Sequence, residues 1–239
     1  MNLFPAEYCL ICHSEIEQEI GWVELLLRTE KQVVCSECRG KLQLIEGERC
    51  LVCGRPFAGM DPLFIKEKQC LDCIRWENAA EWKGVLWKNT SLYEYNPFMK
   101  EVMARYKYRG DYALAAVFAD ELRKVLGKEK PDFIVPIPLS EKRLYERGFN
   151  QSEAIINAAG HSPSSLLVRT HSEKQSKKTR NERIRLQQVF GLKEETGLHS
   201  KHILLIDDIY TTGSTLRHAA IILKQHGAES ISSITIARG

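Results

Sequence analysis

The chain has 239 residues, of which 44% are hydrophobic and 27% are charged, and its formal net charge is +3. These values are typical of a soluble protein that can bury one sizeable core and a smaller module. No apolar run approaches the ~20 residues of a membrane-spanning helix, and the first residues lack the charged-then-apolar order of a signal peptide. We therefore expect a cytoplasmic protein without membrane insertion.

Charge and cysteine content divide the chain into two parts. Residues 1–89 hold 11 Lys/Arg and 14 Asp/Glu, a net charge of −3, whereas residues 90–239 have a net charge of +6. All eight cysteines lie in the first part. We predict a small cysteine-rich module at residues 1–80 and a larger, basic domain at residues 81–239.

The cysteines form four C-x-x-C pairs. They are Cys9/Cys12, Cys35/Cys38, Cys50/Cys53 and Cys70/Cys73. This spacing lets two thiolates from one tight turn reach a single tetrahedral ion, and two such turns complete a four-thiolate site. Four turns therefore predict two structural Zn²⁺ sites, whose closed coordination shells leave no position for catalysis.

Two alternatives bear on this interpretation. Disulfides are disfavoured by a reducing cytoplasm, and a bond within C-x-x-C closes too small a loop to stabilise a fold. The pairs can also combine in series, as two ribbons, or alternately, as a cross-brace. We favour the series arrangement because residues 50–73 resemble a self-contained ribbon with a short strand-like segment.

Residues 81–95 are rich in aromatic residues and predict one or two strands leading into the larger domain. Apolar spacing then predicts helices around residues 98–106 and 114–122. Arg105, Lys107 and Arg109 alternate with tyrosines between these helices. Alternating cations and aromatic rings suit single-stranded nucleic acid, although a solvated helix end with exposed tyrosines has the same pattern.

A second strand is predicted at residues 133–138, followed by a basic loop and a helix over residues 154–158. Arg143 and Arg147 lie in this loop, where cationic side chains and exposed amides are suited to an anion. A basic surface turn is the alternative.

Residues 166–169 predict a further strand, and the stretch after it, which lies between two core strands, is strongly basic. Residues 169–185 carry a net charge of +5 and no apolar face, which favours a mobile loop or frayed helix. Lys177, Lys178 and Arg180 are candidates for contacts with nucleic-acid phosphates, and a solvated charge run is the alternative.

The most informative stretch is residues 203–216. Four apolar residues, typical of a buried parallel strand, precede Asp207 and Asp208, and an apolar pattern with helical spacing runs over residues 216–226. Between them lie small, hydroxylated or flexible residues, namely Thr211, Thr212, Gly213, Ser214 and Thr215. Free amides and hydroxyls at a helix N-terminus suit a phosphate monoester, and the two carboxylates suit a vicinal diol or a divalent metal. Ordinary turn and capping chemistry is the alternative.

This stretch resembles the phosphoribosyl pyrophosphate (PRPP) loop of type I phosphoribosyltransferases, and residues 231–236 supply a final strand. The resemblance implies an α/β fold with a parallel sheet flanked by helices. It also implies that Asp207 and Asp208 hold the ribose hydroxyls, as binding and catalytic residues, and that Thr211 to Thr215 hold the 5-phosphate. By the same resemblance, Arg143 and Arg147 bind pyrophosphate, Mg²⁺ accompanies PRPP, and the basic stretch after residue 169 closes over the ligand.

The order of motifs along the chain resembles the ComF/ComFC family. The motifs are the zinc pairs, Lys107 to Asp111, Pro136-x-Pro138 with Arg147 to Gln151, the basic stretch and the PRPP loop. Within residues 175–187 the chain departs from the family pattern at Lys178 and Leu186. The resemblance implies a role in natural transformation, in which incoming single-stranded DNA is handled with a ComFA-type ATPase. An active transferase with an unknown acceptor and a zinc-ribbon scaffold with an inert transferase fold are the alternatives.

Overall fold

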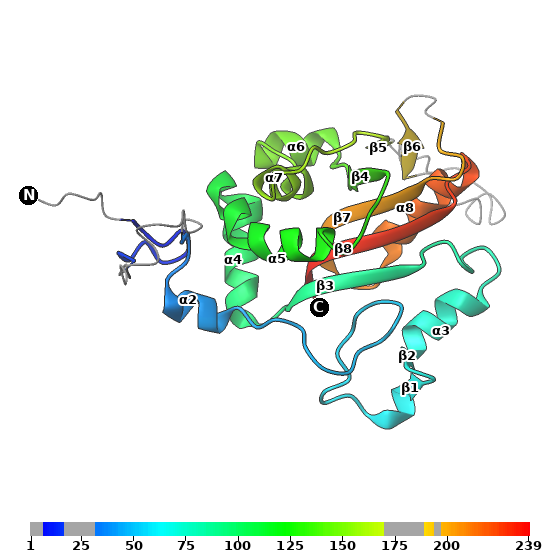
Figure 1. Ribbon diagram of the computed structural model, residues 1–239, viewed down its shortest axis with the longest axis horizontal. Helices are drawn as coiled ribbons and strands as arrows, with labels where there is room; N and C mark the ends of the chain where they lie inside the picture. Colours follow the sequence, from blue (N-terminus) through cyan, green and yellow to red (C-terminus); the bar gives the residue numbers. More distant parts are fainter. Residues whose placement is uncertain (1–6, 17–31, 170–188, 194–196) are drawn as a thin grey trace, which may run out of the picture.

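The computed structural model describes residues 7–16, 32–169, 189–193 and 197–239. Its centre is a four-stranded parallel sheet with the order β3-β8-β7-β4 (Figure 1). The strands are β3 (Lys88–Glu94), β4 (Phe133–Pro136), β7 (His202–Tyr210) and β8 (Ser230–Arg238). β7 and β8 are central and largely buried, and β7 begins with the continuous apolar run that is typical of a buried parallel strand. The predicted fold class is confirmed.

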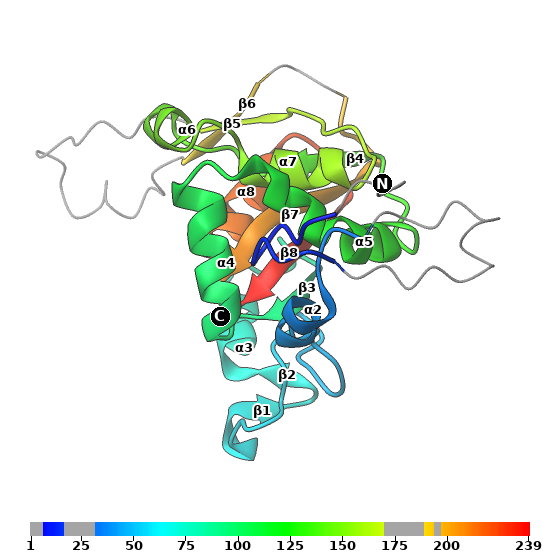
Figure 2. The same ribbon diagram turned by 90° about the vertical axis from the view of Figure 1, so that its left-hand side faces the viewer.

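Helices cover both faces of the sheet (Figure 2). One apolar cluster joins α4 (Pro97–Tyr108), α5 (Ala115–Leu126) and α7 (Gln151–Ala158) to Leu204 and Ile206 of β7. A second cluster joins α8 (Ser214–Gln225) to Ile203 and Leu205 of the same strand. Alternate residues of β7 therefore supply opposite cores, as the twofold repeat of a strand requires. In the part of the chain described here, no helix is both long and apolar enough to span a membrane.

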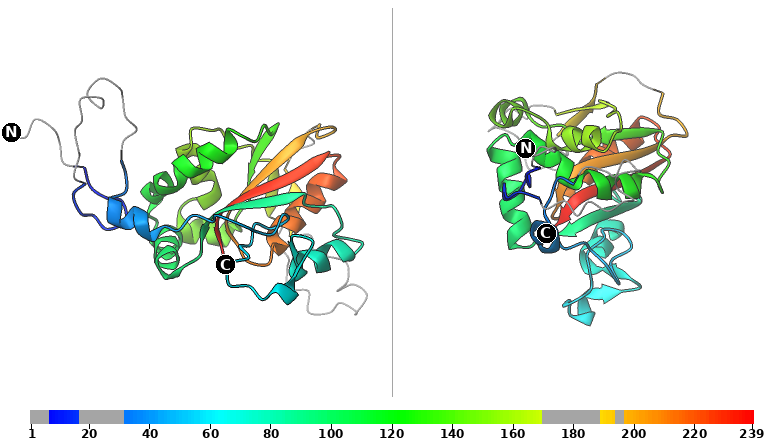
Figure 3. Two further views of the ribbon diagram at one scale, coloured as in Figure 1. Left: turned by 60° about the horizontal axis from the view of Figure 1, so that its bottom comes forward. Right: turned by 60° about the vertical axis from the view of Figure 1, so that its left-hand side comes forward.

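The N-terminal cysteines form two separate modules (Figure 3). The first includes α2 (Ser36–Lys41), and its Cys9 and Cys38 belong to the apolar cluster of α4 and α5. The second contains the 3₁₀ turn η1 (Pro62–Phe64), the hairpin β1 (Ile65–Lys66) and β2 (Gln69–Cys70), and α3 (Leu71–Asn78). Its four cysteines belong to the cluster of α8. The two modules thus pack on different faces of the central sheet. The predicted domain boundary between residues 80 and 81 remains a prediction.

The chain between the modules lies along the outer edge of the sheet. Ile45 donates its amide to the carbonyl of Leu92 (2.9 Å), and Glu94 donates to the carbonyl of Gln43 (2.9 Å). Farther along β3, Asn89 donates to the carbonyl of Val52 (2.7 Å). These bonds satisfy edge groups of β3 that would otherwise be open to another strand.

The structure corrects two expectations. Residues 166–169 were expected to form a further core strand, but β5 (Leu167–Arg169) pairs with β6 (Phe190–Leu192), antiparallel, in a two-stranded sheet separate from the central one. The basic loop after β4 is instead largely the helix α6 (Glu141–Arg147). Ser140 caps its first turn by accepting from the amide of Arg143 (3.3 Å), and Gly148 ends it in a left-handed conformation. The 3₁₀ turn η2 (Tyr112–Leu114) joins α4 to α5.

Candidate active site and zinc centres

Two acids lie near the carboxyl end of β7. Pro136, the last residue of β4, pairs with Ile206, so Asp207 and Asp208 lie just past the end of the shorter neighbouring strand. The carboxyl ends of parallel strands are where ligands bind in open α/β sheets. Asp208 donates its backbone amide to Oδ1 of Asp207 (2.9 Å), and both residues are only partly accessible to solvent.

Two cations from different helices approach Asp208. Nζ of Lys107, in the last turn of α4, lies 3.0 Å from Oδ2 of Asp208. Nη1 of Arg147, the last residue of α6, lies 4.0 Å from the same oxygen and donates to Oε1 of Gln151 (2.8 Å). The guanidinium also lies over the ring of Tyr108, 5.6 Å from its centroid. The acid pair is therefore bordered by fixed positive charge.

Asp207 is held in an environment that disfavours its charged form. Burial and the neighbouring carboxylate of Asp208 raise the pKa of Asp207 to about 7, against the opposing effects of Lys107 and Arg147. Near neutral pH the Asp207 carboxyl therefore keeps part of its proton. A divalent cation at these carboxylate oxygens would fit the donor chemistry of Mg²⁺ and would release the Asp207 proton.

The predicted phosphate loop follows β7 directly. Thr211 and Thr212 are exposed in a bend, and α8 begins at Ser214, two residues earlier than expected. Gly213 caps the helix with φ +78°, and an added Cβ would lie 2.2 Å from Oη of Tyr210. Only glycine therefore fits this position without displacement of its neighbours. The first amides of the 12-residue helix α8 point toward this bend, where they favour an anion.

The two arginines predicted to bind pyrophosphate differ in placement. Arg147 borders the acids, whereas Arg143 is exposed on α6. A further cation, Arg169 at the end of β5, was counted in the sequence only as part of the basic stretch. Burial lowers the pKa of Arg169, Arg143 acts in the same direction, and Asp207 opposes both. Arg169 is therefore within electrostatic reach of Asp207, a proximity that the sequence does not show.

The candidates for nucleic-acid binding are placed in different surroundings. Arg105 donates to the carbonyls of Leu10 (3.3 Å) and Ile11 in the first cysteine turn, and it pairs with Asp111 (3.0 Å). Lys107 contacts Asp208, as described above, and Arg109 is exposed at the end of α4. The other three predicted contacts, Lys177, Lys178 and Arg180, lie outside the described residues.

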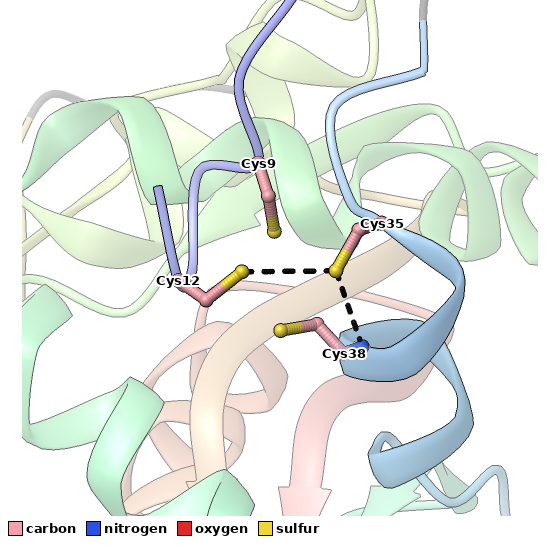
Figure 4. Close-up of side chains that lie close together, drawn as sticks. All are labelled: Cys9, Cys12, Cys35 and Cys38. Atoms are coloured by element: carbon pink, nitrogen blue, oxygen red, sulfur yellow. Dashed lines mark hydrogen bonds between the residues drawn. The ribbon is translucent and has the colours of Figure 1, made fainter. Parts of the chain in front are cut away.

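The cysteines gather into two four-thiol clusters, in series. Cys9, Cys12, Cys35 and Cys38 form the first (Figure 4), and Cys50, Cys53, Cys70 and Cys73 form the second. Within each cluster all Sγ atoms lie within 4.8 Å of one another, and Sγ atoms of different pairs come as close as 3.7 Å and 3.6 Å. Tetrahedral Zn²⁺ with ~2.3 Å bonds to sulfur requires separations of about 3.8 Å. The donor sets therefore fit structural zinc, and His13 belongs to neither of them.

The zinc clusters differ in their surroundings. All four cysteines of the second cluster are buried, whereas Cys12 of the first is exposed. Hydrogen bonding by the side chain and backbone of Ser14 lowers the pKa of Cys12 to about 6, which favours the thiolate that binds metal. The more enclosed second cluster lies beside the phosphate loop, on the α8 side of the sheet.

Comparisons with known proteins agree with both parts of this architecture. A double zinc ribbon domain matches residues 2–74, and a phosphoribosyl transferase domain matches residues 113–239. Competence protein ComFC of Bacillus subtilis is 38% identical over 96% of this chain and 94% of its own length. Competence protein ComFC of Streptococcus pneumoniae is 34% identical over 96% of this chain and 99% of its own length. The DNA utilization protein YhgH of Salmonella typhimurium is 27% identical over 83% of this chain and 93% of its own length.

Proposed function

Because the chain belongs to the ComFC family, we propose that it is a competence protein that binds PRPP or a related ribosyl phosphate together with Mg²⁺. The observation that carries this proposal is the direct succession of acid pair, glycine bend and helix N-terminus at the carboxyl end of β7. No other arrangement in the described chain joins acceptors for a diol to donors for a phosphate in this way.

In this proposal each part of the ligand meets complementary groups. Asp207 and Asp208 accept hydrogen bonds from the ribose hydroxyls or bind Mg²⁺, and residues 211–215 bind the 5-phosphate through amides and hydroxyls. Arg147, with Arg143 and Arg169 near it, supplies positive charge for the pyrophosphate. The cations and the acids lie on different elements, so the bound ligand would join α6, β5 and β7.

Calorimetric titration with Mg²⁺-PRPP tests the acid pair. We expect tight binding to the zinc-loaded protein and no measurable binding after the double substitution Asp207→Asn and Asp208→Asn, which keeps side-chain size. Asp132→Asn is the control, because Asp132 precedes β4 at the opposite end of the sheet and pairs with Lys201 (2.9 Å). Wild-type affinity in the double variant would contradict the assignment.

We further propose that the protein handles incoming single-stranded DNA in the cytoplasm, with a ComFA-type ATPase as its partner. The names of the relatives concern competence and DNA utilization, which supports this role. Tyr108 is 73% exposed beside exposed Arg109, which together offer a flat ring and a positive charge. The basic stretch with Lys177, Lys178 and Arg180 adds further cations for phosphates.

The salt dependence of DNA binding tests the basic stretch. Replacing Lys177, Lys178 and Arg180 by Ala should make the slope of log K against log salt shallower by about 2, because each single-strand phosphate contact contributes about 0.7. A control variant replaces three exposed basic residues in the last turn of α5 and just after it, namely Lys124, Lys128 and Lys130. Equal slopes in the two variants, measured by fluorescence anisotropy, would exclude the stretch as a DNA contact.

A second candidate function is transferase turnover, in which pyrophosphate leaves the ribose as an acceptor attacks it. The cations around the acid pair favour this reaction, since they would stabilise the departing charge. Pyrophosphate release from PRPP in the presence of candidate acceptors tests it. Release no faster than in buffer would leave binding alone as the function.

A further inference from the structure

Trp76, in the second zinc ribbon, contacts the phosphate loop. Nε1 of Trp76 donates to the backbone carbonyl of Thr212 (3.1 Å), across 136 positions of sequence. Trp76 lies on α3, which begins directly after Cys70 and contains Cys73. The zinc cluster therefore sets the direction from which this helix approaches the loop.

The Trp76 ring is itself held on one edge. Trp82 packs against it at 5.0 Å between centroids in an edge-on arrangement, and Trp82 in turn packs against His218 of α8 at 4.9 Å. Such aromatic contacts fix ring orientation as well as burying apolar area. The contacts with Trp82, and through it with His218 of α8, thus hold the Trp76 indole N–H in position to donate to the loop.

Beneath the loop lies a buried cation. Arg217 is fully buried, its guanidinium lies 4.8 Å from the Trp76 ring centroid, and it donates to Oη of Tyr210 (2.8 Å). Its Nε and Nη2 have no hydrogen-bond partner among the described residues. A Cβ added at Gly213 would lie 2.4 Å from Nη1 of Arg217, so the guanidinium supports the bend directly. A buried charge is costly without a compensating anion, and a phosphate in the loop would supply one.

A second link joins the ribbon to the last residue of β7. Nη1 of Arg238 donates to the carbonyl of Tyr210 (3.1 Å), while Nη2 lies 4.0 Å from Sγ of Cys53. A zinc ion with four thiolates carries a net charge of −2, so the Arg238 guanidinium compensates the cluster. Because Tyr210 also accepts from Arg217, the metal cluster and the loop share one buried network.

We propose that Trp76 is a positioning residue of the phosphate loop, through which the second zinc ribbon holds Thr212 and Arg217 in the geometry that binds a phosphate. The proposal rests on the function proposed above, since it assigns a determinant of the same site. It predicts that ribosyl phosphate affinity depends on an intact second zinc cluster.

The substitution Trp76→Phe tests this, because it keeps a ring over Arg217 and removes the N–H donor to Thr212. We expect Mg²⁺-PRPP to bind up to about fivefold more weakly, because binding must then also order the loop, and one hydrogen bond contributes a factor of about five. Hydrogen exchange in residues 210–217 should also become faster in the ligand-free protein, with two zinc ions retained per chain. Trp87→Phe is the matched control, because Trp87 is 63% exposed and its ring lies near Lys88, 4.8 Å from the ammonium.

A spectroscopic signal tests the contact without any substitution at Trp76. In protein labelled with 5-fluorotryptophan, the ¹⁹F signal of Trp76 should shift when Mg²⁺-PRPP binds, and that of Trp87 should not. This measurement decides the proposal if Trp76→Phe loses zinc or fails to fold.

Two results would overturn the proposal. One is wild-type affinity together with unchanged loop exchange in Trp76→Phe, and the other is a Trp76 signal that stays in place while PRPP binds. If the wild-type protein does not bind PRPP, the proposed function fails, but the exchange comparison still decides whether Trp76 positions the loop.

Discussion

The crowding around Gly213 leads to a quantitative prediction for Gly213→Ala. Gly213 has φ +78° and Gly160 has φ +80°, so alanine is strained by a similar amount at either position. The two sites differ in space: an ideal Cβ at Gly213 would lie 2.2 Å from Oη of Tyr210 and 2.4 Å from Nη1 of Arg217, whereas nothing lies within 4 Å at Gly160. Gly160→Ala therefore serves as the matched control.

The expected magnitudes follow from these contacts. The left-handed backbone costs an alanine about 1 kcal/mol at each site. At Gly213 the added carbon must also displace Tyr210 and the fully buried Arg217, and overpacking of this kind costs about 1–3 kcal/mol. Gly213→Ala should therefore destabilise the fold by about 2–4 kcal/mol and Gly160→Ala by about 1 kcal/mol.

Urea denaturation of the zinc-loaded variants, followed by circular dichroism, measures the difference. Calorimetry on the same samples should show that Gly213→Ala also weakens PRPP binding, because its Cβ occupies the bend. Equal losses of stability at the two positions would refute the steric argument, since strain of the backbone alone would then explain both.

Three further predictions concern the acids and the zinc clusters. The folded pKa of Asp207 is raised from 3.8 to about 7, so the folded protein keeps a proton that the unfolded chain loses. Stability in the absence of ligand should therefore fall as pH rises from about 4 to 7, and Asp207→Asn should flatten this part of the denaturation profile. Unchanged slopes would contradict the raised pKa. Lys107→Met removes the ammonium that lies 3.0 Å from Asp208, so the pKa of Asp207 should rise. The fall of stability with pH should then occur at higher pH. If its midpoint does not change, Lys107 does not act on the acid pair. Cys53→Ser should lower the melting temperature and zinc content more than Cys12→Ser, because Cys53 is buried in the core of α8 and Cys12 is exposed; equal losses would show that burial is not what distinguishes the clusters.

The sequence predicted an element correctly where the residues of that element, or those next to it, are enough to specify its structure. The apolar run before Asp207 predicts β7, and the hydroxyl-rich bend predicts the start of α8 to within two residues. The ends of α6 were also readable, because Ser140 is a good N-cap and Gly148 a typical terminator, but the basic residues between them suggested a loop. The prediction of a loop was wrong because it gave the basic side chains more weight than the capping residues at the two ends.

Other features depend on segments that are distant in sequence. β5 has the composition of a core strand, yet it pairs antiparallel with β6, outside the central sheet. Lys107 follows the pattern of a nucleic-acid contact, but the packing of α4 beside β7 brings it to Asp208. A local sequence pattern cannot predict this ion pair, because Lys107 lies on a helix and Asp208 on a strand about 100 residues later.

The sequence by itself determined the parallel α/β fold, the cysteine pairs and the order of strand, bend and helix around residues 207–215, because spacing and backbone propensity act within a few residues. Only the tertiary structure decided that Arg105 serves the first cysteine turn and that Trp76 reaches Thr212. It also buried Arg217 beneath Gly213. These contacts arise from packing two modules against opposite faces of one sheet, and packing depends on the shapes of all the surfaces that meet.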